Sequence, residues 1–179
     1  ARVGVKTLLM GQSAGGGSTI TQQLAKLLFT PTAKTKWERV YQKLTEWVIA
    51  TKLEKYYTKD EIITMYFNKF DFLNNAVGIK SASQIYFNKA PNELKVEEAA
   101  LLVGMLQNPT RYNPVRNRTK EASKNRRNIV LSQMVVNNKL TQAECDSLSA
   151  LDITLNYQKV DHKLGLAPYF REYLRKIMT

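Results

Sequence analysis

Cysteine and histidine, which often form disulfides or metal sites, are almost missing from this sequence. Its 179 residues include one cysteine, Cys145, and one histidine, His162. A lone cysteine excludes a disulfide within the chain, and a single Cys/His pair cannot supply a structural zinc site. The longest apolar run, Ala99–Leu106, is far shorter than the roughly 20 residues that a membrane-spanning helix needs. The sequence therefore predicts a fold held together by packing, with no span of its own.

Acidic residues are also scarce relative to basic ones. The chain has 27 Lys and Arg residues against 15 Asp and Glu, which gives a formal charge of +12. Such an excess predicts a polyanionic partner, and nucleic acid, an anionic membrane surface or a phosphorylated substrate would each satisfy it. Hydrophobic residues make up 44% of the chain, which is enough for it to fold around a core.

The hydrophobic pattern is helical almost throughout, and no convincing set of strands is present, so we predict an all-α fold. Helices are expected after Thr19, from Trp37 to about Tyr57, and over 58–68, 78–87, 96–107, 120–138 and a short stretch after Thr141. Three of these begin with a capping box, in which Thr precedes Glu or Gln by three residues. The stretch 151–160 alternates weakly and is expected to be extended.

The helix from Trp37 to Tyr57 carries two different strips. Its apolar residues recur at the spacing of one helix face, and we expect that face, with both tryptophans, to pack in the core; lipid contact by one tryptophan is the alternative. The apolar strip consists of Trp37, Val40, Tyr41, Leu44, Trp47 and Val48. Lys43, Glu46 and Ala50 lie on another strip. A cation and a carboxylate beside a small residue suit an anionic ligand, or they form a surface ion pair worth about 0.3 kcal/mol.

The glycine-rich stretch before the first helix, residues 15–17, allows two interpretations. Glycines that lead into a helix N-terminus leave backbone N–H groups free to bind an anion. The alternative is a mobile linker followed by an ordinary cap. The stretch contains neither a Walker loop nor a dinucleotide-binding fingerprint.

Sequence motifs carry a more specific signal. Gly16–Gln23 (GGSTITQQ) matches, letter for letter, the second motif of the peptidoglycan glycosyltransferase domain of class A penicillin-binding proteins. Gln42–Ala50 (QKLTEWVIA) resembles the third motif, R-K-x-x-E-x-x-x-A, and Ile62–Asn68 (IITMYFN) resembles the fourth, I-L-E-x-Y-L-N. Tyr86–Pro114 is similar to the fifth motif region, and Leu166–Arg175 resembles the linker to a transpeptidase domain. The resemblance therefore covers nearly the whole chain.

The resemblance implies a helical, lysozyme-like two-lobed domain on the outer, extracytoplasmic face of the cytoplasmic membrane. It implies polymerisation of lipid II into glycan strands by inverting transfer, with release of undecaprenyl pyrophosphate, in cell-wall synthesis. Residues 1–150 would form the glycosyltransferase domain and 151–179 a linker towards a transpeptidase domain. The expected partners are lipid II, the growing glycan chain, the anionic membrane surface and proteins of cell-wall elongation or division. A diphosphate substrate would account for the basic composition without nucleic acid.

The same resemblance assigns roles to individual residues. Glu46 and Lys43 match the carboxylate and lysine of the third motif, where Lys43 is expected to neutralise leaving-group charge and Glu46 to organise basic residues or bind Mg²⁺ or Mn²⁺. The residues expected to bind substrate are Gly17, Ser18, Thr19, Gln22, Gln23, Lys26, Arg39 and Asn68. Arg39 enters as a substitute for a family arginine that has no clean counterpart here, with Lys36 as the alternative.

The sequence also departs from the family pattern. The first motif, E-D-x-x-F-x-x-H-x-G, which supplies the general base, is absent, so we expect the chain as printed to be inactive. Gln42 replaces the arginine of the third motif, and Thr64 replaces the glutamate of the fourth. Glu46 is a poor substitute base because nearby Lys43 favours its charged form, which is a weak proton acceptor.

Three other functions remain open from the sequence. A lytic transglycosylase or lysozyme would need a protonated glutamate in an apolar pocket, and no residue pattern marks one. A nucleic-acid binder would rely on the basic stretch Lys120–Arg127, which a solvated helix face explains equally. A docking module that has lost catalysis would be consistent with the missing first motif.

Overall fold

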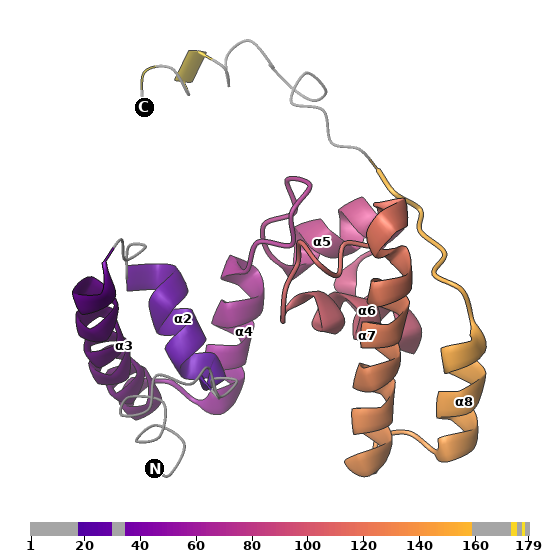
Figure 1. Ribbon diagram of the computed structural model, residues 1–179, viewed down its shortest axis with the longest axis horizontal. Coiled ribbons are helices and arrows are strands. Elements are labelled where there is room, and N and C mark those ends of the chain that lie inside the picture. Colours follow the sequence, from indigo (N-terminus) through magenta and orange to yellow (C-terminus); the bar gives the residue numbers. More distant parts are fainter. Residues whose placement is uncertain (1–17, 30–34, 159–172, 175–176, 178–179) are drawn as a thin grey trace. The chain divides into compact units, whose positions relative to one another are not determined.

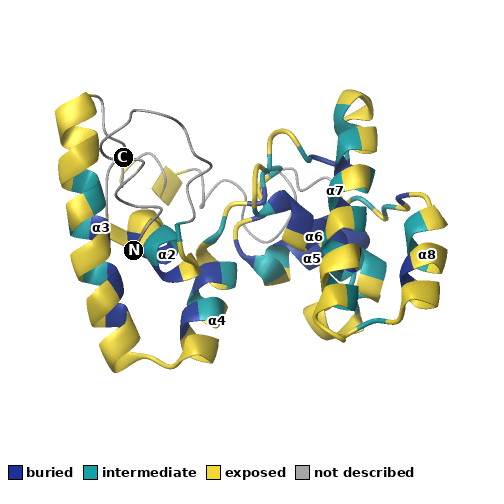
Figure 2. Ribbon diagram, turned by 60° about the horizontal axis from the view of Figure 1, so that its bottom comes forward, coloured by how far each residue is buried: buried dark blue, intermediate teal, exposed yellow. Residues whose placement is uncertain are grey.

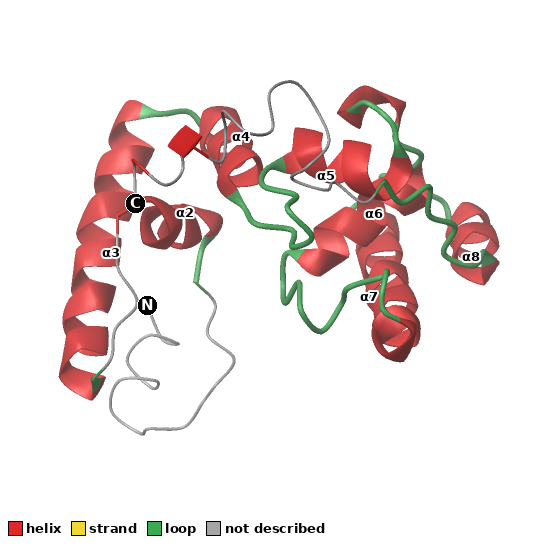
Figure 3. Cartoon of the chain, turned by 90° about the horizontal axis from the view of Figure 1, so that it is seen from above, coloured by secondary structure: helices red, strands yellow, loops and turns green. Residues whose placement is uncertain are grey.

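The computed structural model describes residues 18–29, 35–158, 173–174 and 177, and these are helical for most of their length (Figure 1). The elements are α2 (Ile20–Phe29), α3 (Lys36–Tyr56), α4 (Lys59–Lys69), α5 (Ile79–Phe87), the 3₁₀ helix η1 (Pro91–Glu93), α6 (Val96–Met105), α7 (Asn117–Val136) and α8 (Gln142–Ala150). The described ranges contain no strand, and one isolated β-bridge joins Asp71 to Val77 (Figure 3). The predicted all-α class is confirmed.

The predicted capping boxes form. The Thr58 hydroxyl accepts the Glu61 N–H at the start of α4, and Thr141 does the same for Glu144 at the start of α8. A further box, of Thr35 and Glu38, begins α3 and was not predicted. Each box satisfies N–H groups that the first helical turn leaves without partners. Residues 152–158, which were expected to be extended, carry no regular secondary structure.

The chain divides into two compact units, Ala1–Phe70 and Asp71–Thr179. In the first unit, α2 packs against both α3 and α4. Its buried apolar side chains come from all three helices: Leu24, Ala25, Ala50, Leu53, Ile62 and Tyr66. Helix α2 is thus the central element of this unit.

The second unit is built around the packing of α6 on α7 and of α7 on α8. A hydrophobic core cluster of Ala100, Leu131 and Cys145 joins these three helices. The guanidinium of Arg127, 1% exposed, donates to the carbonyl oxygens of Ser149 (3.1 Å) and Leu151 (2.7 Å). Arg127 therefore fixes the end of α8 to the middle of α7.

The predicted core face of α3 is wrong. Trp37 is 84% exposed and Trp47 is 43% exposed, and the rest of the apolar strip is exposed with them, whereas Glu46 and Ala50 are buried (Figure 2). The small side chain of Ala50 lies on the strip that packs, and a small residue lets a neighbouring helix approach closely. The wider apolar strip is left facing outward.

Candidate functional site

The centre of the candidate site is an ion pair on α3 that touches the start of α2. The Nζ of Lys43 lies 2.6 Å from Oε2 of Glu46 and also donates to Oγ of Ser18 at 3.4 Å. The Glu46 side chain is 1% exposed and that of Lys43 is 39% exposed. The pair therefore runs from the interior of the unit to its surface, and the ammonium group is the accessible end.

The two oxygens of the Glu46 carboxylate differ in their hydrogen bonding. Its Oε1 is buried and has no hydrogen-bond partner among the described residues. A buried carboxylate oxygen without a donor costs stability, and such groups usually need an explanation. Oε1 is thus an acceptor whose hydrogen-bonding capacity no described residue uses.

The fit of a divalent cation depends on what surrounds Glu46. Within the described ranges, no group of three or more His, Cys, Asp or Glu side chains could hold a metal ion. Mg²⁺ is commonly held by one or two carboxylates together with substrate phosphates. Glu46 offers a single carboxylate for such a cation, and Lys43 already supplies positive charge beside it, so the expected Mg²⁺ or Mn²⁺ stays a prediction.

The two adjacent glutamines of α2 make hydrogen bonds within the protein. The Gln22 N–H donates to the Thr19 hydroxyl (3.2 Å), and the Thr19 N–H donates to the Gln22 side-chain oxygen (3.4 Å). The side-chain amide of Gln23 donates to the Ser18 carbonyl (3.3 Å) and accepts from the Tyr66 hydroxyl (2.9 Å). The sequence predicted contacts with substrate here, and the structure shows that both glutamines also hold the backbone at residues 18 and 19.

The remaining predicted residues lie on three different helices. Lys26 is exposed in the last turn of α2, Arg39 in the first turn of α3, and Asn68 near the end of α4. Gly17 lies outside the described residues. The structure joins Ser18, Lys43 and Glu46 directly and Gln23 through Ser18, and it leaves the contributions of the other predicted residues as predictions.

Sequence reasoning missed Tyr66. Its hydroxyl contacts Gln23 from α4, 43 positions further along the chain. The available signal was its place inside IITMYFN, the stretch similar to the fourth motif, but no local pattern predicts a hydrogen bond between residues so far apart.

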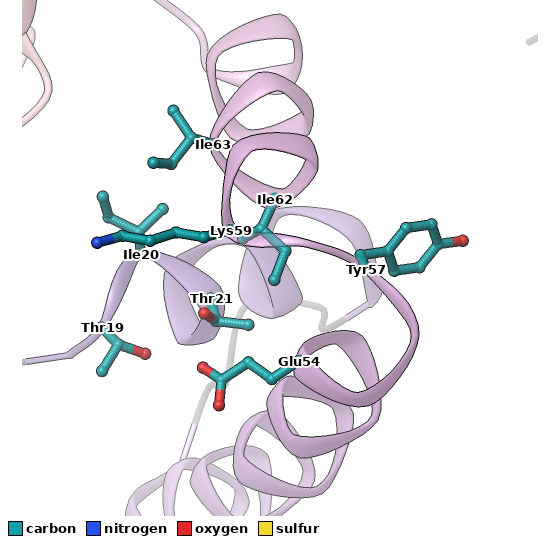
Figure 4. Close-up of a pocket in the computed structure, with 8 residues that line it drawn as sticks. All are labelled: Thr19, Ile20, Thr21, Glu54, Tyr57, Lys59, Ile62 and Ile63. Atoms are coloured by element: carbon teal, nitrogen blue, oxygen red, sulfur yellow. The ribbon is translucent and has the colours of Figure 1, made fainter.

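A cavity of about 430 Å³ opens beside this cluster, where the start of α2, the end of α3 and the start of α4 meet (Figure 4). Its lining consists of Thr19, Ile20, Thr21, Glu54, Tyr57, Lys59, Ile62 and Ile63. Thr19 links this cavity to the loop that carries Ser18.

Comparison with known proteins adds evidence independent of this geometry. The family model described as Transglycosylase matches residues 1–135. Penicillin-binding protein 1A of Escherichia coli (strain K12) is 34% identical over 171 residues, which is 96% of this chain and 19% of the relative. Penicillin-binding protein 1A of Neisseria gonorrhoeae is 36% identical over 98% of the chain and 21% of the relative. The chain spans about a fifth of the length of these curated relatives.

Two further similarities agree with these. Penicillin-binding protein 2a of Streptococcus pneumoniae serotype 2 is 41% identical over 144 residues, covering 77% of this chain and 19% of the relative. The crystal structure of penicillin-binding protein 1A from Haemophilus influenzae matches 89% of the chain and 19% of its own, with 26% identity and a TM-score of 0.50.

Proposed function

Because the chain belongs to the transglycosylase family, we propose that it is a peptidoglycan glycosyltransferase domain that polymerises lipid II in bacterial cell-wall synthesis. In this proposal the 4-hydroxyl of one sugar attacks the anomeric carbon of the growing chain, which inverts, and undecaprenyl pyrophosphate leaves. The observation that carries the proposal is the Lys43–Glu46 pair, with its buried carboxylate and accessible ammonium group.

The proposed chemistry assigns the pair to the leaving group. Negative charge grows on the diphosphate as its bond to the anomeric carbon breaks. A cation fixed beside the diphosphate therefore stabilises the transition state more than the ground state. Glu46 holds the Lys43 ammonium in place at 2.6 Å, so the charge needs little reorganisation during the reaction. A divalent cation, where present, would supply further charge to the same diphosphate.

The start of α2 would act on the same anion. Ser18 presents its hydroxyl to Lys43, and the helix that begins at Ile20 adds the partial positive charge of its N-terminus. Glu46 is not assigned as the general base because its Oε2 is engaged by Lys43. The base remains assigned to the first motif of the family, which the printed sequence lacks.

The location of the substrate leads to a proposal about the membrane. No helix in the described ranges is long and apolar enough to cross a bilayer. The exposed apolar strip of α3 carries two tryptophans and a tyrosine, and exposed Lys36, Arg39 and Lys52 lie on the same helix. Aromatic and basic residues together are typical of surfaces that rest on anionic lipid. We propose that this strip faces the outer leaflet of the cytoplasmic membrane, where a lipid-linked substrate resides.

A polymerisation assay tests the proposal. The full natural chain, given labelled lipid II, is expected to form long glycan strands, and Glu46→Gln or Lys43→Ala to slow their formation at least ~100-fold. Lys124→Ala is the matched control, because Lys124 forms an ion pair of the same 2.6 Å length with exposed Asp152. Unchanged elongation by Glu46→Gln would refute the assigned role. Shortening of preformed glycan would favour a lytic enzyme. Tight, salt-dependent binding of DNA would favour a nucleic-acid-binding protein.

A further inference from the structure

The hydrogen bonds around Gln23 form a path between helices of the first unit. The Tyr66 hydroxyl on α4 donates to the Gln23 side-chain oxygen, and the amide of Gln23 donates to the carbonyl of Ser18. The Ser18 hydroxyl then accepts from Lys43 on α3. Four residues thus connect α4 to the ion pair through the loop that precedes α2.

Tyr66 is well suited to be the fixed end of this path. It is 2% exposed, and its ring lies 6.1 Å from that of Phe67 and 5.6 Å from that of Phe70, measured between centroids. A packed ring has few rotamers available, so its hydroxyl points in a defined direction. The hydroxyl is protonated and able to donate at neutral pH, as in any tyrosine, and burial raises the pKa of Tyr66 further.

The partners at its two ends fix the Gln23 amide in one orientation. An amide has an accepting oxygen and a donating nitrogen of similar size, and it can turn by half a rotation unless its partners distinguish the two ends. The Ser18 carbonyl can only accept, so the amide nitrogen faces it, and the amide oxygen is left to accept from the Tyr66 hydroxyl. Without the Tyr66 hydroxyl, the amide oxygen loses its partner, and the side chain that donates to the Ser18 carbonyl is held at one end only.

We propose that Tyr66 is a positioning residue for glycosyl transfer, which acts through Gln23 to hold the Ser18 hydroxyl against Lys43. Tyr66 itself touches none of the residues of the ion pair in this path; its effect passes through the amide and the loop backbone. This inference rests on the proposed function, because it names a residue that supports the same diphosphate site.

A double-mutant cycle in the full natural chain tests the path. Tyr66→Phe keeps the ring and removes the hydroxyl, so we expect kcat for strand elongation to fall about tenfold while the KM for lipid II changes less than about twofold. Gln23→Ala is expected to show a similar or larger loss. Since Tyr66 acts through Gln23, the double variant should be no slower than Gln23→Ala alone. Tyr157→Phe, which keeps a half-buried ring in the second unit and lies outside the motif stretches, is the control and should elongate at the normal rate.

Two kinetic outcomes would overturn the inference. One is an unchanged kcat in Tyr66→Phe. The other is a double variant whose loss equals the product of the two single losses, because independent effects multiply. If the unsubstituted protein makes no glycan strands, the proposed function is refuted. The hydrogen-bond path must then be tested by a measurement that does not depend on activity.

Solution NMR supplies that activity-independent measurement. In protein labelled with ¹⁵N-glutamine, the side-chain amide signal that disappears in Gln23→Ala belongs to Gln23. Tyr66→Phe is expected to shift this signal, while Tyr157→Phe leaves it in place. A Gln23 signal that does not respond to Tyr66→Phe would contradict the path whatever the enzyme does.

Discussion

Residues 43 and 46 differ sharply in their contact with solvent. Glu46 is 1% exposed, and removing a carboxylate from water costs several kcal/mol unless a cation and hydrogen bonds compensate. Lys43 provides that compensation to Oε2 alone, while Oε1 remains without a partner in the described structure. The buried carboxylate of Glu46 therefore lowers the free energy of unfolding, as is common where a charge must be fixed for binding or catalysis.

Replacing Lys43 should make this cost in stability measurable. We expect Lys43→Ala to lower the free energy of unfolding by about 3 kcal/mol, because it leaves the Glu46 charge buried and unpaired. Adding Glu46→Gln to Lys43→Ala should recover part of the loss, since a neutral amide is easier to bury. Urea denaturation measures both. Lys124→Ala, whose partner Asp152 is exposed, should cost less than about 1 kcal/mol; equal losses for the two lysines would contradict the explanation.

Tyr86 gives the second unit a characteristic response to alkali. Its hydroxyl donates to the Phe72 carbonyl (2.7 Å) and accepts from the Asn74 amide (2.9 Å), and burial raises its pKa from 10.0 to about 12. The folded state therefore holds this proton more tightly than the unfolded state. The resulting stability is fully present below pH 10 and is lost as pH rises towards 12.

This loss of stability is tested by measuring the free energy of unfolding at pH 9 and at pH 11.5 for the wild type and for Tyr86→Phe. Wild type should lose on the order of 1–2 kcal/mol more than Tyr86→Phe over that interval, because phenylalanine has no proton to lose. Lysines titrate in the same range in both proteins, so the difference between the two curves isolates Tyr86. Parallel curves would show that its hydroxyl titrates normally.

Among the helices, α3 has the most unusual division of its surface. One strip buries Glu46, Ala50 and Leu53, while large apolar side chains on the other strip stay exposed. A long exposed apolar strip marks a surface that contacts something else, and the proposed partner here is anionic lipid.

Polar substitutions on this strip should separate binding from folding. We expect Leu44→Ser combined with Val48→Ser, at positions 51% and 58% exposed, to weaken co-sedimentation with phosphatidylglycerol vesicles at least about fivefold. The free energy of unfolding should change by less than about 0.5 kcal/mol, as is usual at exposed positions. Val136→Ser, 72% exposed on α7, is the control for a general loss of apolar surface. Normal vesicle binding by the double variant would exclude this strip as the contact.

The helices show which kinds of structure the sequence could predict. Capping boxes such as Thr58 with Glu61 are local, so the helix starts that they predict are confirmed, whereas α7, which has no side-chain cap, begins at Asn117 and not at Lys120. The strip around Trp37 and Trp47 was misassigned because an apolar period indicates a face that avoids water without indicating what covers it. The burial of Glu46 and the contact between Tyr66 and Gln23 depend on how α2, α3 and α4 pack, and no spacing within one helix encodes that.

At the scale of the whole molecule, the second unit has its own core and its own internal ties. Ile153 is 7% exposed, so the chain beyond α8 still contributes to this core. The N–H groups of Asn156 and Gln158 donate to the carbonyls of Tyr86 and Ile85. Residues 151–158 thus return from α8 to the end of α5. The prediction that a linker towards a transpeptidase domain begins at 151 stays a prediction.

A fragment of residues 71–158 should therefore fold without the first unit. We expect it to show helical circular dichroism and a cooperative urea transition, because its buried apolar side chains contact one another. A fragment of residues 71–150 serves as the comparison and should be less stable, since it lacks Ile153 and the Leu151 carbonyl that Arg127 binds. A non-cooperative 71–158 fragment would show that this unit depends on the rest of the protein.

The return of residues 156 and 158 to α5 has a mechanical consequence. A load applied to the chain at Gln158 would reach the last turn of α5 through two backbone hydrogen bonds, at 3.1 Å to Tyr86 and 2.8 Å to Ile85, before it reached α8. Tyr86 is also anchored through its hydroxyl to the loop at Phe72 and Asn74. Tension from that end would be shared by α5 and this loop, which lie at the N-terminal edge of the second unit.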